Sequence, residues 1–245
     1  MLAITSFHPD KQPYGLTCLE TLSKFFPGKI VAYVEGALEV PGVEVKDFWA
    51  IPGVKEYLEK IKRTPGSDGV KDFGVYDYRF DTSKFCRKVF AQDQAFDLDK
   101  EVFWFDADCV VFKSLPAELL SGLIKGVPFA YLGRQSYTET GWLGFNTNHE
   151  KFKDFRSRYL NCFLSGRIFQ QPEWHDCYAF DYARQGIKGN DLTPKSKGTE
   201  HVLLKSVLSQ YMDHKKGPKR KSLGYSPGHP LHDGRGYRPV LGDGK

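Results

Sequence analysis

The sequence contains no apolar run long enough to cross a bilayer, and its first ten residues, MLAITSFHPD, hold no basic segment followed by an apolar one. We therefore expect neither a transmembrane helix of about 20 apolar residues nor a secretory signal. Hydrophobic residues make up 40% of the 245 positions, which is enough for the core of one large domain or two small ones. The sequence predicts a soluble, cytoplasmic protein.

Cysteine is scarce and shows no pairing pattern. The chain has five cysteines, an odd number, and none of them forms a C-x-x-C pair. Cys18, Cys86 and Cys109 fall in predicted helices or a strand, where cysteine acts as a small apolar residue. A zinc site around His175 and Cys177 would lack a second close pair of ligands. Reduced thiols in a cytoplasmic setting are the interpretation that we favour.

Internal repeats are absent, and positive charge is concentrated in one place. The formal net charge is +5, and much of the excess lies in residues 214–221, HKKGPKRK. A local basic run favours phosphate binding over a surface that coats nucleic acid. Nucleic-acid binding would also need aromatic residues between the basic ones, and this run has none. We expect no nucleic-acid partner.

Apolar periodicity and turn residues predict strands that alternate with helices. The predicted strands are 2–7, 29–34, 43–48, 102–105, 110–112 and 127–132, and the predicted helices are 14–26, 53–62, 82–98, 116–124, 149–164, 175–185 and 199–214. A strand, a helix and a strand at this spacing form a βαβ unit, which requires parallel pairing. The predicted fold class is α/β, with one Rossmann-like domain over 1–222 whose mixed, mostly parallel sheet is flanked by helices. Residues 223–245 are rich in Gly, Pro and charge, which predicts a loosely ordered basic tail.

The most informative stretch is Glu101 to Lys113, EVFWFDADCVVFK. Its apolar residues predict a strand that is buried on both faces. Asp106 and Asp108 are two positions apart, so in an extended chain both carboxylates would point to one side. Two adjacent buried carboxylates need a neutralising cation, and Mg²⁺ or Mn²⁺ bound to phosphate oxygens provides one. The alternative is that the strand stops at Asp106 and both aspartates are solvated in a turn.

The basic run near the C-terminus supplies groups that could complete such a site. His214 offers an imidazole, which is a good ligand for Mn²⁺, and Gly217 allows a close approach of the backbone. Lys219 and Arg220 can neutralise a diphosphate. Alone, this run would more often be a solvated surface or a targeting signal.

These motifs resemble those of metal-dependent A-type (GT-A) glycosyltransferases, closest in pattern to the glycogenin and lipopolysaccharide galactosyltransferase group. That group carries D-x-D at the end of an apolar strand, matched by Asp106 and Asp108, and H-x-x-G-x-x-K near the C-terminus, matched by His214 and Gly217 with Arg220 in place of Lys. The Pro-Trp that usually follows is replaced by Lys221-Ser222. The resemblance covers roughly residues 1–222.

The resemblance implies transfer of a sugar, of the hexose type, from a nucleotide-diphosphate donor, UDP-sugar first, to a glycan or other hydroxyl acceptor. It implies that Asp106, Asp108 and His214 hold Mn²⁺ or Mg²⁺ on the diphosphate. It also places an acidic residue near the transferred sugar or the acceptor, and Asp176 is our candidate, with His175 beside it. An aspartate at this position could instead simply cap the helix.

Further donor-binding candidates come from the ends of predicted strands and from the helix before the D-x-D strand. A Rossmann-type sheet binds its nucleotide beyond the carboxyl ends of its strands. The candidates are Thr5, Ser6, Phe7, Glu35, Lys84, Arg87, Ala107 and Asn146, the last as a loose echo of a family F-N-x-G segment. Lys84 and Arg87 fit a solvated cationic surface equally well.

Two other function classes stay open. Asp106-x-Asp108-x-Val110 also fits the D-x-D-x-[T/V] pattern of haloacid-dehalogenase-like phosphatases, in which the first Asp is the nucleophile. Those proteins usually carry the motif on the first strand, whereas here about a hundred residues precede it. A non-catalytic module that binds a nucleotide sugar is the other alternative.

Overall fold

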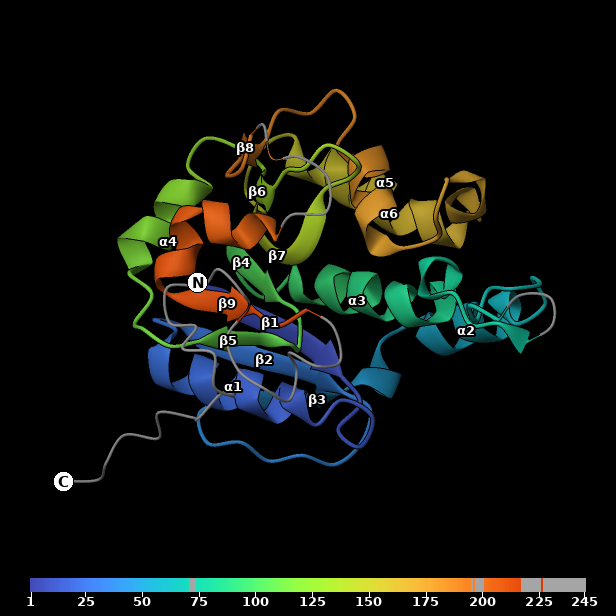
Figure 1. The fold of residues 1–245 in the computed structure, drawn as a ribbon, viewed down its shortest axis with the longest axis horizontal. Coiled ribbons are helices and arrows are strands. Elements are labelled where there is room, and N and C mark those ends of the chain that lie inside the picture. The colour runs from blue at the N-terminus through green and yellow to red at the C-terminus, as the bar shows by residue number, and fades with distance from the viewer. Residues whose placement is uncertain (71–73, 195, 197–200, 217–225, 227–245) are drawn as a thin grey trace.

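A seven-stranded sheet forms the centre of the protein (Figure 1). The computed structural model describes residues 1–70, 74–194, 196, 201–216 and 226. The strand order is β3-β2-β1-β4-β7-β6-β8, and β1, β2, β3 and β4 pair in parallel while β7 runs antiparallel to both of its neighbours. The strands are β1 (Leu2–Phe7), β2 (Lys29–Val34), β3 (Glu44–Asp47), β4 (Glu101–Phe105), β6 (Phe129–Leu132), β7 (Glu139–Asn146) and β8 (Asn190–Asp191).

Helices cover both faces of this sheet (Figure 1). They are α1 (Tyr14–Phe25), α2 (Val54–Ile61), α3 (Thr82–Ala95), α4 (Ala117–Leu123), α5 (Phe152–Leu164) and α6 (Asp176–Ala183). One face packs against α2, α3, α5 and α6, and the other packs against α1, α4 and residues 202–212. The predicted α/β fold with a mixed, mostly parallel sheet between helices is confirmed.

Strand β4 shows why this sequence needs two covered faces. Val102 and Trp104 belong to the hydrophobic cluster on the α3 face, and Phe103 and Phe105 belong to the cluster on the α1 face. All four side chains are at most 2% exposed. Because successive side chains of a strand alternate between faces, a run of four apolar residues has to be buried on both sides. Burial of β4 on both faces fixes its carboxyl end, where Asp106 follows.

A second, two-stranded sheet pairs β5 (Cys109–Val111) with β9 (Met212–His214) in antiparallel orientation. The predicted helix over 199–214 is therefore wrong for residues 201–214, which form 3₁₀ turns at Val202–Lys205 and Val207–Gln210 before β9. Ser206 is extended between the two turns, and its hydroxyl donates to the Leu203 carbonyl, which competes with helical hydrogen bonding. Pairing with β5 then outweighs the local helix propensity.

The other predicted helices and strands are present, with ends shifted by a few residues. Of the predicted tail 223–245, the structure describes only Ser226, whose backbone N–H donates to Asp213 Oδ2 and which is buried. The remaining tail residues lie outside the described part of the chain. Among the described residues, no helix is both long and apolar enough to cross a membrane.

Candidate functional site

Asp106 and Asp108 lie in a tight turn that joins β4 to β5. The strand ends at Phe105, and the backbone N–H of Cys109 donates to the Asp106 carbonyl to close the turn. The predicted extended D-x-D segment is therefore wrong. The aspartates are not fully solvated either, because their side chains are 30% and 12% exposed. The turn keeps both carboxylates at the edge of the sheet and partly shielded from water.

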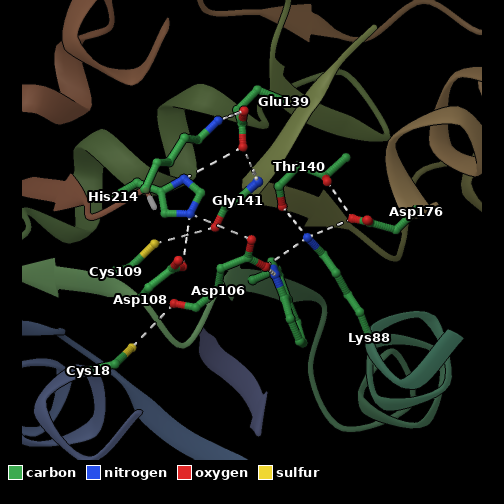
Figure 2. Close-up of polar contacts among 12 residues, drawn as sticks. Cys18, Lys88, Asp106, Asp108, Cys109, Glu139, Thr140, Gly141, Asp176 and His214 are labelled. Atoms are coloured by element: carbon green, nitrogen blue, oxygen red, sulfur yellow. Dashed lines mark hydrogen bonds and ion pairs between the residues drawn. The ribbon is translucent and has the colours of Figure 1, made fainter. Parts of the chain in front are cut away.

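His214 completes a cluster with these two carboxylates (Figure 2). Antiparallel pairing of β9 with β5 places His214 directly opposite Cys109, the residue after Asp108. His214 Nε2 lies 2.9 Å from Asp108 Oδ1 and 3.7 Å from Asp106 Oδ2. One nitrogen or oxygen atom from each of the three residues lies within 4.8 Å of the others, which is close enough to share one metal ion. The structure thus brings together three residues that are far apart in the sequence.

The chemistry of this donor set fits a hard or borderline divalent cation. Carboxylate oxygens suit Mg²⁺ and Mn²⁺, and an imidazole nitrogen shifts the preference toward Mn²⁺. Burial lowers the pKa of His214, but the nearby Asp108 and Asp106 carboxylates raise it more, so the pKa lies above its ordinary value. The same two carboxylates that attract the imidazolium proton would attract a cation in its place.

A cleft of about 190 Å³ opens beside this cluster, at the carboxyl ends of β1, β2 and β4. The predicted site residues among those that line it are Ser6, Phe7, Glu35, Lys84, Arg87, Asp106, Ala107, Asp108 and Asp176. Thr5 is also a candidate, but its side chain is fully buried and does not line the cleft. The structure therefore gathers most of the candidates around one cavity, at the edge of the sheet where Rossmann-type folds bind ligands.

Arg87 and Lys84, one turn apart on α3, differ in environment. Arg87 Nε lies 2.7 Å from Glu35 Oε1, so this ion pair joins α3 to the residue that follows β2. Lys84 is exposed. Since both lysine and arginine line the cleft, each side chain is within reach of a ligand bound there.

Lys88 is the residue that the sequence analysis missed. It is 8% exposed, and its Nζ lies 2.8 Å from Asp106 Oδ1 and 2.9 Å from Asp176 Oδ2 (Figure 2). Burial lowers the pKa of Lys88, but Asp106 and Asp176 raise it more, so the ammonium is favoured. A signal was present: Lys88 lies three residues after Phe85 in the predicted helix 82–98, so both side chains share one face, and a charge on an apolar face needs a partner.

Asp176 faces the cleft instead of capping its helix. It is the first residue of α6, and no side chain caps this helix end. Its carboxylate, 4% exposed, accepts hydrogen bonds from Thr140 Oγ1 and pairs with Lys88. Burial raises the pKa of Asp176, but Lys88 and His175 lower it more, so the carboxylate is held ionised. The interpretation of Asp176 as an ordinary N-cap is therefore wrong.

His175 is buried beside Asp176 but does not line the cleft. Its Nε2 lies 2.7 Å from Glu173 Oε2, and its ring packs against Phe85, Tyr137 and Tyr178 with centroid distances of 5.0–5.5 Å. Phe85 in turn lines the cleft, so one aromatic ring separates His175 from it.

Asn146 lies away from the cluster. It pairs with Glu101 at the beginning of β4, whereas Asp106 follows the end of that strand. The adjacent Trp142, Leu143 and Phe145 are fully buried in the core. The interpretation of the Gly144-Phe145-Asn146 segment as part of the donor site is therefore not supported by its position. Gly217, Lys219 and Arg220 lie outside the described residues.

Comparison with known proteins gives no match to a protein-family model and none to a curated protein. Solved structures with a similar fold include mouse xyloside xylosyltransferase 1 in its apo form, 11% identical with a TM-score of 0.46, covering 81% of this chain and 84% of its own. The bifunctional glycosyltransferase WbbM is 12% identical with a TM-score of 0.47, covering 75% of this chain and 37% of its own. The glycosyltransferase GlyE of Streptococcus pneumoniae TIGR4 is 13% identical with a TM-score of 0.44, covering 80% of this chain and 45% of its own. This chain therefore spans less than half the length of the last two, and the likeness concerns the fold.

Proposed function

We propose that the protein is a metal-dependent glycosyltransferase, which moves a sugar from a nucleoside-diphosphate donor to an acceptor hydroxyl. The observation that carries the proposal is the convergence of Asp106, Asp108 and His214 at the edge of the cleft. Asp106, Asp108 and His214 occupy the D-x-D and histidine positions of the two motifs that resemble those of A-type glycosyltransferases. The place of this cluster beyond the carboxyl ends of parallel strands suits a nucleotide ligand.

The three clustered residues would hold Mn²⁺ or Mg²⁺ through two carboxylates and one imidazole. When bound, such an ion neutralises the charge that develops on the departing nucleoside diphosphate. The chain's own residues orient the carboxylates: Trp104 Nε1 donates to Asp106 Oδ1 at 2.6 Å, and Lys88 pairs with the same oxygen. Asp106 Oδ2 is left facing His214.

We assign the nucleoside to the part of the cleft at the ends of β1 and β2, lined by Ser6, Phe7 and Glu35. Uridine is the first base to test, because the resemblance points to UDP-sugars. Arg87 and Glu35 form an ion pair and both line this side of the cleft, where the Glu35 carboxylate can accept a hydrogen bond from a ribose hydroxyl. Lys84, which is exposed on the same rim, is placed to attract phosphate.

We assign the transferred sugar to the side of the cleft near Asp176. Lys88 separates this carboxylate from Asp106, so the metal side and the sugar side are held at a fixed spacing by one buried ammonium. An ionised carboxylate here can accept the proton of the acceptor hydroxyl, or stabilise positive charge at the anomeric carbon. The first role gives inversion of configuration and the second suits retention, and analysis of the anomeric product separates them.

The test is thermal unfolding of the full chain with nucleoside diphosphates and their sugar conjugates, with and without Mn²⁺. A ligand that binds only the folded state raises the melting temperature by mass action. At a free concentration one hundred times Kd, it adds about 2.7 kcal/mol to the free energy of unfolding. We expect one nucleoside diphosphate to raise the melting temperature beyond the effect of Mn²⁺ alone, and only when Mn²⁺ is present. This further shift should disappear in Asp108→Ala. Asp154→Ala, an exposed carboxylate on α5, is the control and should keep the shift.

Other outcomes distinguish the alternatives. If no nucleotide shifts the melting temperature but phosphate esters are hydrolysed with Mg²⁺, the phosphatase interpretation with Asp106 as nucleophile replaces ours. If Mn²⁺ and a nucleotide sugar bind but neither transfer nor hydrolysis of the donor is detected with a broad acceptor panel, the protein is a binding module. Transfer at the wild-type rate by Asp108→Ala would contradict the metal assignment.

A further inference from the structure

Behind the imidazole of His214, on the side away from the aspartates, lies a buried glutamate (Figure 2). Glu139 begins β7 and is 5% exposed. Its Oε1 lies 3.6 Å from His214 Nδ1 and accepts a hydrogen bond of 3.1 Å from the backbone N–H of Gly141. This carboxylate is therefore fixed by its own strand and faces the ring nitrogen that the aspartates do not contact.

The charge of Glu139 is compensated by two cations. Lys216 Nζ contacts Oε2, and Arg134 Nη1 lies 3.6 Å from the same oxygen. Arg134 is itself held, since its Nε donates to the Tyr137 carbonyl at 3.0 Å. Both oxygens of Glu139 therefore have partners, Oε1 in the Gly141 N–H and Oε2 in the two cations, so the carboxylate is held in one orientation beside the ring.

Gly141 supplies the space for the imidazole. A Cβ atom built on Gly141 would lie 2.2 Å from His214 Cε1 and 2.3 Å from Nδ1, well inside the contact distance of real atoms. The ring therefore packs directly on the glycine backbone, and any side chain at this position would displace it. The Gly141 carbonyl also accepts the Asp106 backbone N–H at 2.8 Å, so this residue contacts both sides of the cluster.

The Nδ1 atom of His214 is buried and has no hydrogen-bond partner among the described residues. Buried polar groups in native proteins almost always have a hydrogen-bond partner, so a partner for this nitrogen atom is to be expected among the groups that surround it. The Glu139 carboxylate lies on that side, and its Oε1 is 3.6 Å from Nδ1, a separation that a small rotation of the ring would bring into hydrogen-bonding range.

We propose that Glu139 and Gly141 are positioning residues for the metal ligand His214. Glu139 accepts the Nδ1 proton, which selects the tautomer whose Nε2 lone pair is available to a cation, and Gly141 leaves room for that ring orientation. Metal-bound histidines commonly make this second hydrogen bond to a carboxylate, and its loss typically weakens metal binding about 10–100-fold. The inference rests on the proposed metal site but assigns residues that the sequence motifs do not contain.

The experiment measures Mn²⁺ binding to the full chain without donor or acceptor, from the electron paramagnetic resonance signal of the free ion. We expect Glu139→Leu and Gly141→Ala to bind Mn²⁺ about 10–100-fold more weakly than wild type. Glu139→Gln, which keeps an acceptor oxygen, should lose less. A spectroscopic readout independent of affinity is the ¹⁵N shift of the His214 ring in the Mg²⁺-saturated protein, which should report Nδ1–H in wild type and a mixture of tautomers in Glu139→Leu.

Two matched controls distinguish a loss of His214 orientation from a general destabilisation of β7. Asp181→Leu removes the carboxylate that accepts hydrogen bonds from Thr138 N and Oγ1, next to Glu139, without touching the cluster. Gly144→Ala adds a methyl on the same strand, where it would meet Ile124 Cγ2 in the core. Both should retain wild-type Mn²⁺ affinity.

The outcomes are distinguishable. If wild type binds Mn²⁺ and Glu139→Leu and Gly141→Ala bind it equally well, the positioning role is wrong while the proposed function stands. An equal loss in Asp181→Leu would also overturn it, because support of the strand would then explain the effect. If wild type binds no Mn²⁺, the proposed function itself fails. Should Glu139→Leu not fold, an unchanged His214 tautomer in Glu139→Ala, which also removes the acceptor, together with unchanged affinity in Gly141→Ala would overturn the inference.

Discussion

Lys88 Nζ lies 2.9 Å from Asp176 Oδ2, and both side chains are almost completely buried, at 9% and 4% exposure. The same ammonium lies 2.8 Å from Asp106 Oδ1. One cation thus connects the helix that precedes β4, the turn that follows it and the first residue of α6. Because burial of an ion is costly unless it is paired, this contact fixes the spacing between the two acidic groups of the cleft.

Replacement of Lys88 by Met should destabilise the protein by about 3–5 kcal/mol, because Asp106 and Asp176 would be left without their shared cation. Lys84→Met is the matched control, one turn earlier on α3, and should change stability by no more than about 0.5 kcal/mol because Lys84 is exposed. Urea unfolding at neutral pH measures both. Equal stability of the two variants would show that the buried contact does not hold the site together.

Asn146→Ala should leave both the Mn²⁺-dependent nucleotide shift and the rate of transfer within about twofold of wild type. Asn146 pairs with Glu101 at the beginning of β4, at the opposite end of the strand from Asp106. Its backbone N–H donates to the Pro128 carbonyl and does not depend on the side chain. Nucleotide titrations and initial rates provide the measurement. A tenfold loss of donor affinity in this variant would show that Asn146 contributes to donor binding after all.

The sequence was sufficient to predict the fold class and to select Asp106, Asp108 and His214, which the structure brings together, but not the electrostatic network around them. Residues 102–105 of β4 form an unbroken apolar run, so the burial of this strand on both faces follows directly from the pattern. His214 was found through its spacing from Gly217, although the local sequence predicted the wrong secondary structure for it. Pairing of β9 with β5 is a contact between distant segments, which local propensity does not encode.

Lys88 and Glu139 illustrate what the sequence left open. Lys88 lies in a predicted helix, whereas Glu139 lies in a segment for which no strand was predicted. The importance of each depends on partners that folding brings from elsewhere in the chain. Lys88 meets Asp176 only when α6 packs beside α3, and Glu139 meets His214 only when β9 forms. The sequence can therefore indicate that a charged residue is buried, but it does not show which residue pairs with it.

Asp97→Asn should reduce stability at neutral pH by at most about 1 kcal/mol, because Asp97 is 63% exposed. Arg156 on α5 hydrogen bonds to Asp97 at 2.5 Å and holds the pKa of that carboxyl below its usual value. A depressed pKa in the folded state contributes stability above the unfolded pKa of about 3.9, and this contribution is lost as the pH falls through the folded value. The gap between wild type and variant should therefore close as the pH falls below about 4. Denaturant unfolding across this range is the measurement, and a gap independent of pH would contradict the assignment.

Asp176→Asn should abolish most sugar transfer while leaving donor binding intact. The amide keeps the shape and an acceptor oxygen for Thr140 and Lys88, but it removes the negative charge, so a rate loss of about 10²–10⁴-fold is expected for a group that accepts a proton or stabilises charge in the transition state. Asp176 lies outside the cluster of Asp106, Asp108 and His214, so the Mn²⁺-dependent nucleotide shift should persist.

The matched control for this variant is Asp181→Asn, a second aspartate on α6, whose carboxylate accepts hydrogen bonds from Thr138 and Arg184. Initial rates and thermal shifts on the same preparations separate the two effects. Loss of both transfer and the nucleotide shift in Asp176→Asn would mean that Asp176 supports the donor site through Lys88 and Asp106. Unchanged transfer would show that Asp176 takes no part in the chemistry and only compensates the charge of Lys88.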